Sequence, residues 1–175
     1  MVSETIFETR RLRCRHWLPE DLPTIHAVYG DPAVVRWVDD GEPISFADCE
    51  RWMTVTQSNY DRRGYGMFAL EARASGEIVG FCGLVHPGDQ ETPEVKYAFA
   101  QSHWGRGLAT ECVSALLDCG VRRFGLTGIM ATVASENEAS RRVMLKVGAK
   151  HTDTITHGDG SLTDVFMWSA PARET

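Results

Sequence analysis

The chain has 175 residues, of which 43% are hydrophobic and 24% are charged, and these values predict a single folded domain spanning residues 1–175. The net charge of −6 argues against a nucleic-acid binder, because neutralising phosphates needs a basic surface. No apolar run has the length of a signal peptide or a membrane span, so we expect a cytoplasmic protein without membrane partners.

The five cysteines are an odd number, and no two of them have the spacing of metal ligands. The six histidines are scattered and include no His-x-x-x-His pair. We therefore expect reduced thiols, mostly buried as small hydrophobic side chains, and no dedicated metal site.

Hydrophobic periodicity predicts the elements of the first half of the chain. They are a strand over 12–16, a helix over 22–29, a second helix over 46–60 and two strands, 67–72 and 77–86, joined by a hairpin. Ser45, with Asp48 three residues later, resembles a capping box at the start of the second helix.

The second half of the chain has the pattern of a strand–helix–strand unit between residues 94 and 134. Its long amphipathic helix follows Gly105 and Gly107. Ser135 with Glu138 resembles another capping box, which opens a helix that ends at Gly148. A hairpin around 158–160 closes the chain. Together the predicted strands and helices indicate a mixed α/β sheet with several antiparallel hairpins.

Two glycines, Gly105 and Gly107, lie where the strand over 94–100 becomes a helix. Helix N-termini present unpaired N–H groups and a partial positive charge, so small residues there let an anion approach. The P-loop lysine is absent, and Thr110 stands where a dinucleotide fold has its third glycine. The local motif therefore leaves two readings, a plain glycine turn or a site for another pyrophosphate ligand.

A second signal is the pair Asn137 and Ser140, which lie three residues apart and so share a face of the first turn of the following helix. That helix follows the second strand of the strand–helix–strand unit. We expect it to lie beside the first helix, which brings the polar pair close to the glycine loop.

The two motifs together resemble the Gcn5-related N-acetyltransferases, which use acetyl-CoA. The family loop reads Arg/Gln-x-x-Gly-x-Gly/Ala, and here Trp104 replaces its first residue. The stretch WGRGLATE is similar to the RimJ/RimL branch, the ribosomal-protein N-terminal acetyltransferases. Further matches to that branch are Thr9, Arg11, Leu12 and Arg15 at the start of the chain, Asn137, Ser140, Lys146 and Gly148 later, and Asp164 in the terminal hairpin.

The resemblance implies a largely antiparallel sheet with helices on both faces, whose central strands at 94–100 and 126–134 splay apart to admit acetyl-CoA. The pantetheine arm would pair with the backbone of Phe99 and Ala100. Asn137 would hydrogen-bond the pantetheine or the thioester. The pyrophosphate would bind the N–H groups of Trp104, Gly105, Arg106, Gly107, Leu108, Ala109 and Thr110.

For the chemistry, the resemblance implies direct attack of an amine on the thioester. Ser140 would donate to the leaving thiolate, although a capping role in the helix is the alternative. Glu94 is the candidate relay for the amine proton, and a solvated strand-end carboxylate is the alternative. Tyr97 points either into the same cleft or into the core. In this family the region of Trp37, Asp39 and Asp40 shapes the acceptor pocket, and a solvated acidic loop is the alternative for the two aspartates.

The acceptor implied by the branch is a protein N-terminal α-amine. A small amine, such as an antibiotic or a polyamine, is the alternative acceptor. A non-catalytic acyl-CoA-binding module and a nucleotide-binding Rossmann-like domain are the alternatives from other classes, and the missing third glycine disfavours the latter. A homodimer is left open.

Overall fold

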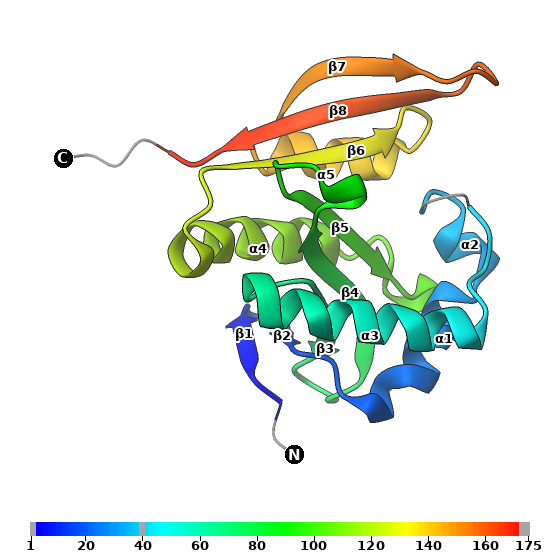
Figure 1. Cartoon of the computed structure of the whole chain (residues 1–175), viewed down its shortest axis with the longest axis vertical. Helices are drawn as coiled ribbons and strands as arrows, with labels where there is room; N and C mark the ends of the chain where they lie inside the picture. The colour runs from blue at the N-terminus through cyan, green and yellow to red at the C-terminus, as the bar shows by residue number, and fades with distance from the viewer. Residues whose placement is uncertain (1–2, 39–40, 172–175) are drawn as a thin grey trace.

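The computed structural model describes residues 3–38 and 41–171. These residues form an eight-stranded sheet of order β1-β2-β3-β4-β5-β6-β8-β7 (Figure 1). Only β5 and β6 are paired in parallel within the described sheet. The strands are β1 Thr5–Glu8, β2 Leu12–Arg15, β3 Met67–Ala72, β4 Ile78–Val85, β5 Glu94–Phe99, β6 Gly128–Ala134, β7 Lys150–Thr156 and β8 Leu162–Ser169.

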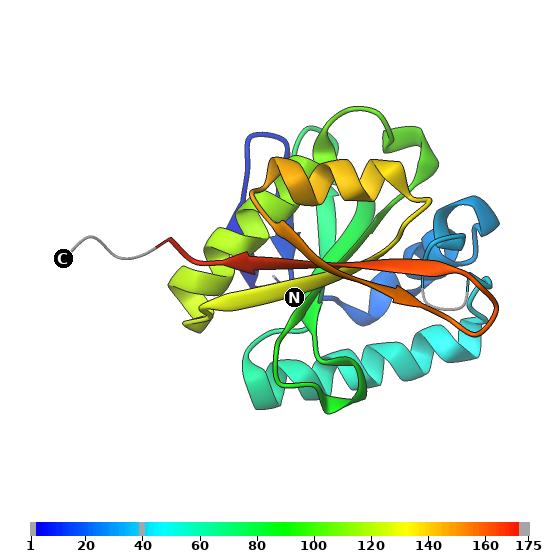
Figure 2. The same cartoon turned by 90° about the horizontal axis from the view of Figure 1, so that it is seen from above.

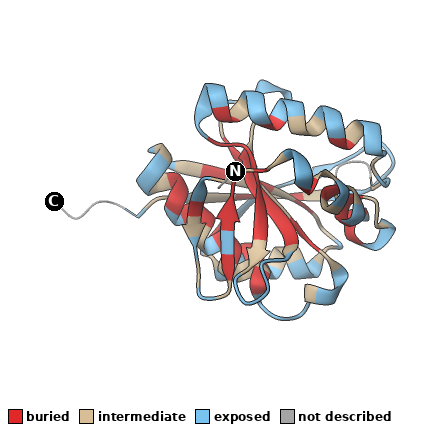
Figure 3. Cartoon of the chain, turned by 90° about the horizontal axis from the view of Figure 1, so that it is seen from below, coloured by how far each residue is buried: buried red, intermediate tan, exposed pale blue. Residues whose placement is uncertain are grey.

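Helices cover both faces of the sheet. The helices are α1 Leu22–Tyr29, α2 Pro32–Val35, α3 Phe46–Arg63, α4 Leu108–Phe124 and α5 Glu138–Lys146, with 3₁₀ turns at η1 Pro19–Asp21, η2 Pro87–Asp89 and η3 Gln101–His103. One apolar core, which includes Phe81, lies beneath α1–α3, and a larger one, which includes Phe68, lies beneath α4 and α5. The central strands β3, β4 and β5 between them are largely buried, whereas β7 at the sheet edge is exposed (Figure 3).

The predicted fold class is confirmed. Every strand and helix predicted from periodicity is present within about three residues of its expected bounds, and Ser45 caps α3 by accepting the Asp48 N–H at 3.1 Å. Gly148, with φ of +85°, follows the end of α5 in the left-handed conformation. Strand β1 was not predicted, because its four residues bury only Ile6 and pairing with β2 stabilises it.

The predicted capping box of Ser135 and Glu138 is wrong. Helix α5 begins at Glu138, and its N-cap is Asn137, whose side-chain oxygen accepts the Ser140 N–H at 3.1 Å. The Ser135 hydroxyl instead donates to Asp164 in β8 at 2.8 Å. A partner 29 residues away in the sequence therefore decided the role of Ser135.

The expectation of buried cysteines is confirmed, since all five are buried and unpaired by disulfides. Burial raises the pKa of the Cys82 and Cys112 thiols well above the ordinary value, which keeps them protonated. Among the described residues, no helix has the length and apolar character needed to cross a membrane.

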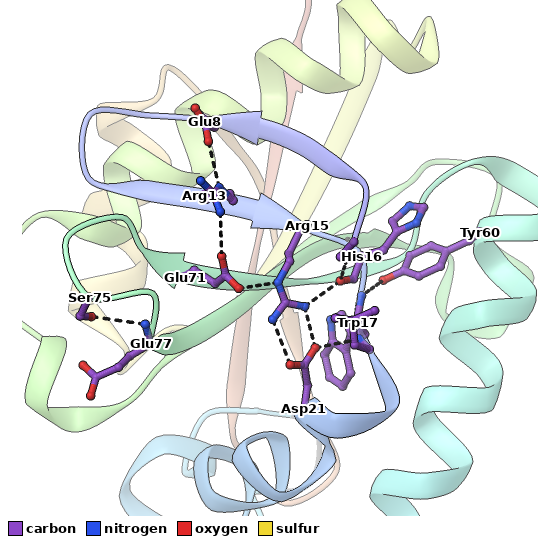
Figure 4. Close-up of polar contacts among 12 residues, drawn as sticks. Glu8, Arg13, Arg15, His16, Trp17, Asp21, Tyr60, Glu71, Ser75 and Glu77 are labelled. Carbon is purple, nitrogen blue, oxygen red and sulfur yellow. Dashed lines mark hydrogen bonds and ion pairs between the residues drawn. The ribbon is translucent and has the colours of Figure 1, made fainter. Parts of the chain in front are cut away.

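A buried ion-pair network joins the first strands to η1 (Figure 4). The guanidinium of Arg15, which is 8% exposed, donates to both carboxylate oxygens of Asp21 at 2.7 and 2.9 Å. It also donates to Glu71 in β3 at 2.5 Å, and Asp21 accepts the Leu18 N–H at 2.7 Å. Bidentate geometry and full pairing make burial of these charges tolerable. The network fixes the chain where β2 leads into α1.

We expect Asp21→Ala to lower the free energy of unfolding by about 3 kcal/mol, because it leaves the buried Arg15 charge with one carboxylate partner. Urea denaturation measures this change. Glu8→Ala is the control, since it breaks only exposed ion pairs, with Arg13 and Arg73, and should cost much less. Equal effects of the two substitutions would contradict the assignment.

Candidate active site

A cavity of about 1350 Å³ opens where β5 and β6 part. Within the described residues the parallel pairing of these strands is limited to Glu94 with Met130, and the strands then diverge (Figure 2). The cavity extends through this opening, because its lining includes side chains of α2 and α3 from one face and of α4 and α5 from the other. The predicted splay between these two strands is confirmed.

The Glu94 side chain holds the two strands together at the point of divergence. Met130 N–H donates to the Pro93 carbonyl at 2.9 Å, as expected for a parallel ladder. The next donor, Thr132 N–H, lies 3.2 Å from Glu94 Oε1, and the Thr132 hydroxyl donates to the same oxygen. A side-chain carboxylate therefore takes the place of a strand carbonyl.

The solvated alternative for Glu94 is wrong, because this residue is 3% exposed. Lys96 Nζ lies 2.7 Å from Glu94 Oε1 and pairs with its charge. The hydrogen bonds and the ion pair that Glu94 makes with described residues all go to its Oε1. Glu94 itself is absent from the described lining of the cavity, whereas Lys96 is part of it.

Hydrogen-bonding directions alternate along β5. Ala100 N–H donates to Val79 of β4 at 2.9 Å, whereas the Pro93 carbonyl faces β6. Because this direction alternates residue by residue, the backbone groups of Val95, Tyr97 and Phe99 face the gap. The backbone of Ala100 was expected to pair with a ligand. Its N–H is bonded to Val79 instead, and its carbonyl accepts the His103 N–H at 2.9 Å. The Phe99 N–H remains suitable for such pairing, whereas the Phe99 carbonyl accepts the Trp104 indole N–H.

The glycine loop has the conformation that two glycines allow. Gly105 and Gly107 have φ of +70° and +74°, in the left-handed region that other residues rarely adopt. A Cβ on Gly105 would extend into open space. Gly107 is the N-cap of α4, and no described side chain caps this helix, whereas Ser45 and Asn137 cap α3 and α5. The first N–H groups of α4 are therefore available to an anion.

Trp104 and Arg106 have different surroundings from the rest of the loop. The Trp104 indole N–H donates to the Phe99 carbonyl at 2.7 Å, so this side chain ties the loop to the end of β5. The Arg106 side chain is exposed and is not part of the described cavity lining. Only the backbone of Arg106 therefore contributes to the glycine loop. Trp104, Gly105, Gly107, Leu108, Ala109 and Thr110 all line the cavity.

The opening Thr9-x-Arg11 motif and Glu111 of the loop motif form one contact network. Arg11 donates to the Arg106 carbonyl at 2.8 Å and to Glu111 at 2.7 Å. Glu111 also accepts from the Thr9 hydroxyl at 2.6 Å. Burial opposes the charge of Glu111, but these hydrogen bonds leave its pKa below the ordinary value. The N-terminal turn thereby fixes the glycine loop, a contact that the sequence motifs did not show.

The Asn137–Ser140 pair lies on the cavity wall across from β5. The Ser140 hydroxyl is 2.7 Å from the hydroxyl of Tyr97, so the Tyr97 side chain reaches the cavity. Tyr97 also packs against the core beneath α4. Burial raises the pKa of Tyr97 to about 12, against the opposing effect of the Ser140 hydrogen bond.

Asp164, buried in β8, anchors the start of α5. Its carboxylate accepts from Ser135 and Thr154 and pairs with Arg141 Nε at 2.7 Å. Burial opposes its charge, but these hydrogen bonds and the Arg141 charge leave the pKa of Asp164 below the ordinary value. The ionised carboxylate thus holds the turn that carries Asn137 and Ser140.

The side of the cavity formed by α1–α3 is largely apolar and aromatic. Its lining includes Tyr29, Val34, Trp37, Ile44 and Trp52. Asp39 and Asp40, which were expected in this region with Trp37, lie outside the described residues. The charged residues of the described lining are predominantly basic: Arg36, Arg62, Arg63, Lys96, Arg142 and Lys146, against Glu42, Asp48 and Asp89.

The sheet split beside an uncapped helix, with a cavity passing between its strands, is the arrangement that the family resemblance implied for an acyl-CoA acyltransferase. The model of the Acetyltransferase (GNAT) domain matches residues 11–150. The chain therefore belongs to the GNAT acetyltransferase family, and it is an N-acetyltransferase. The family part of the predicted resemblance is confirmed.

Similar proteins differ in their acceptors. The uncharacterized N-acetyltransferase YoaA of Bacillus subtilis is 31% identical over 147 residues, which cover 82% of this chain and 81% of YoaA. The structure of RimL, a ribosomal L7/L12 α-N-protein acetyltransferase in complex with coenzyme A, is similar with a TM-score of 0.81, 17% identity and coverage of 95% and 98%. Spermidine N-acetyltransferase from Vibrio cholerae, in complex with CoA and spermine, has a TM-score of 0.76, 17% identity and coverage of 92% and 96%.

Proposed function

We propose that this protein transfers the acetyl group of acetyl-CoA to a primary amine, and that its preferred acceptor is the N-terminal α-amine of a protein. The observation that carries the proposal is the continuous cavity through the gap between β5 and β6. It joins a site for anions at the start of α4 to an apolar pocket beside α1–α3. A donor and an acceptor can therefore enter from different sides.

The residues present fit acetyl-CoA. The uncapped N–H groups of α4 and the open approach at Gly105 suit the pyrophosphate. The gap-facing backbone of β5 suits the amide groups of the pantetheine arm, which pair as an added strand would. Asn137 uses its oxygen to cap α5, so its amide nitrogen is the part of the side chain suited to donate to this arm.

The charges of the cavity favour an α-amine over a polyamine. Predominantly basic side chains in the described lining repel a polycation and suit the phosphates of the donor. At pH 7 deprotonation costs about 1.4 kcal/mol for an α-amine of pKa near 8 and about 4.6 kcal/mol for a lysine. The motif WGRGLATE supports the same acceptor through its similarity to the RimJ/RimL branch.

Glu94 is the proposed acceptor of the amine proton, through water. Its Oε1 is engaged by Thr132 and Lys96, and Oε2 is the oxygen suited to take the proton. The N–H groups of β5 that face the gap would polarise the thioester carbonyl, and Ser140 would donate to the departing sulfur.

The acceptor is tested by following free thiol with acetyl-CoA and a set of amines. We expect kcat/KM for a short peptide with a free N-terminus to exceed that for spermidine, and for the same peptide with a blocked N-terminus and one lysine, by at least about tenfold. Thiol release with spermidine alone would support the small-amine alternative. Binding of acetyl-CoA without thiol release for any amine would support a non-catalytic module.

We expect Arg11→Ala to raise the Kd of coenzyme A about tenfold, because the loop loses its hydrogen bond at the Arg106 carbonyl and its link through Glu111. Isothermal titration calorimetry measures this. Arg13→Ala is the matched control, since this neighbouring arginine pairs with Glu8 and Glu71 away from the loop. An unchanged Kd in Arg11→Ala would exclude the anchoring role.

Glu94→Gln keeps an oxygen for Thr132 but removes the proton acceptor. We expect kcat/KM for the free-N-terminus peptide to fall at least about tenfold at pH 7, and the loss to shrink at pH 9, where an α-amine is already neutral. Steady-state kinetics at both pH values measures this. A loss that is equal at pH 7 and pH 9 would mean that Glu94 acts only by joining the strands.

A further inference from the structure

A hydroxyl pair bridges the gap between β5 and α5. The phenol oxygen of Tyr97 lies 2.7 Å from Ser140 Oγ, and both side chains line the cavity. The proposed reaction uses Ser140 and leaves Tyr97 without a function. No other hydrogen bond to the Tyr97 hydroxyl occurs among the described residues.

The alternation of β5 separates two sets of side chains. Ala98 packs into the core beneath α1–α3, whereas Val95, Tyr97 and Phe99 pack against the core beneath α4 and α5. Glu94 and Lys96 share the face of Ala98 by the same period of two. The side chains proposed to handle the amine and the hydroxyl pair therefore lie on opposite faces of the sheet.

A thioester placed in the gap would meet these two sets from its two sides. The amine would arrive from the apolar pocket beside α1–α3, and the sulfur would lie toward α5. The sulfur gains negative charge as the C–S bond breaks, so a hydroxyl donor on the α5 side stabilises the transition state more than the bound substrate.

We propose that Tyr97 is a positioning residue: its phenol donates to Ser140 Oγ and so turns the Ser140 proton toward the departing sulfur. This inference rests on the proposed function. A phenol is the stronger acid of the two hydroxyls, so the direction of donation runs from Tyr97 to Ser140. The hydrogen bonds of such a chain polarise one another, which makes Ser140 a better donor.

The pair donates hydrogen bonds and keeps its protons. Burial raises the pKa of Tyr97 to about 12, far above the value of about 8.5 that is ordinary for a thiol. The phenol therefore stays neutral and does not protonate the thiolate. In the balanced step the N–C bond forms, the C–S bond breaks with its electron pair on sulfur, and the amine proton leaves through water. Solvent then protonates the thiolate.

Tyr97→Phe tests the inference, because it removes one oxygen and keeps the buried ring. We expect kcat to fall about tenfold, with KM for acetyl-CoA, the Kd of coenzyme A and Tm nearly unchanged. Tyr65→Phe is the matched control, since it removes a hydroxyl that bonds His86 at 3.0 Å and should leave kcat unchanged. A loss of CoA affinity or of Tm with unchanged kcat would reduce the pair to a structural contact and overturn the inference.

A double-substitution cycle separates positioning from an independent effect. If Tyr97 acts through Ser140, adding Tyr97→Phe to Ser140→Ala changes kcat less than about twofold. Multiplied effects would overturn the inference. Normal turnover of both the wild type and Tyr97→Phe would contradict this inference alone, whereas the absence of wild-type thiol release with every amine would contradict the proposed function and the inference with it.

Discussion

The candidate active site depends on the early parting of two parallel strands. A parallel ladder continues as long as each strand offers the other an N–H or a carbonyl, and here it stops after Glu94 and Met130. The Glu94 carboxylate accepts from Thr132 where a carbonyl of β5 would otherwise accept, so the strands separate without leaving that buried donor unpaired. The cavity and the free backbone edge of β5 both follow from this separation.

The same separation explains why residues distant in the sequence meet. Helix α4 begins beside the opening, and its start is held by the N-terminal turn through Arg11 and Glu111. Helix α5 begins on the far side, held to β8 by Asp164. Each anchor relies on a charged group that is partly or fully buried and satisfied by several hydrogen bonds, which makes its geometry rigid.

The two faces of the sheet divide the proposed chemistry. The α1–α3 face provides an apolar pocket and the Glu94–Lys96 pair, which suit a neutral amine. The α4–α5 face provides uncapped N–H groups for phosphates and the Tyr97–Ser140 pair for the sulfur. Because successive side chains of β5 point to opposite faces of the sheet, neighbouring residues of this strand lie in these two different environments.

The sequence by itself determined the features that short-range physics controls. The start of α3 at Ser45, strand alternation and the glycine turn at Gly105 and Gly107 depend on neighbours within a few residues, and the resemblance of two motifs predicted the family. Only the tertiary structure decided the burial of Glu94, the contact of Tyr97 with Ser140 and the role of Ser135. Their partners lie 29 to 43 residues away, and an amino-acid pattern does not specify which distant donor meets a given oxygen when the strands and helices pack.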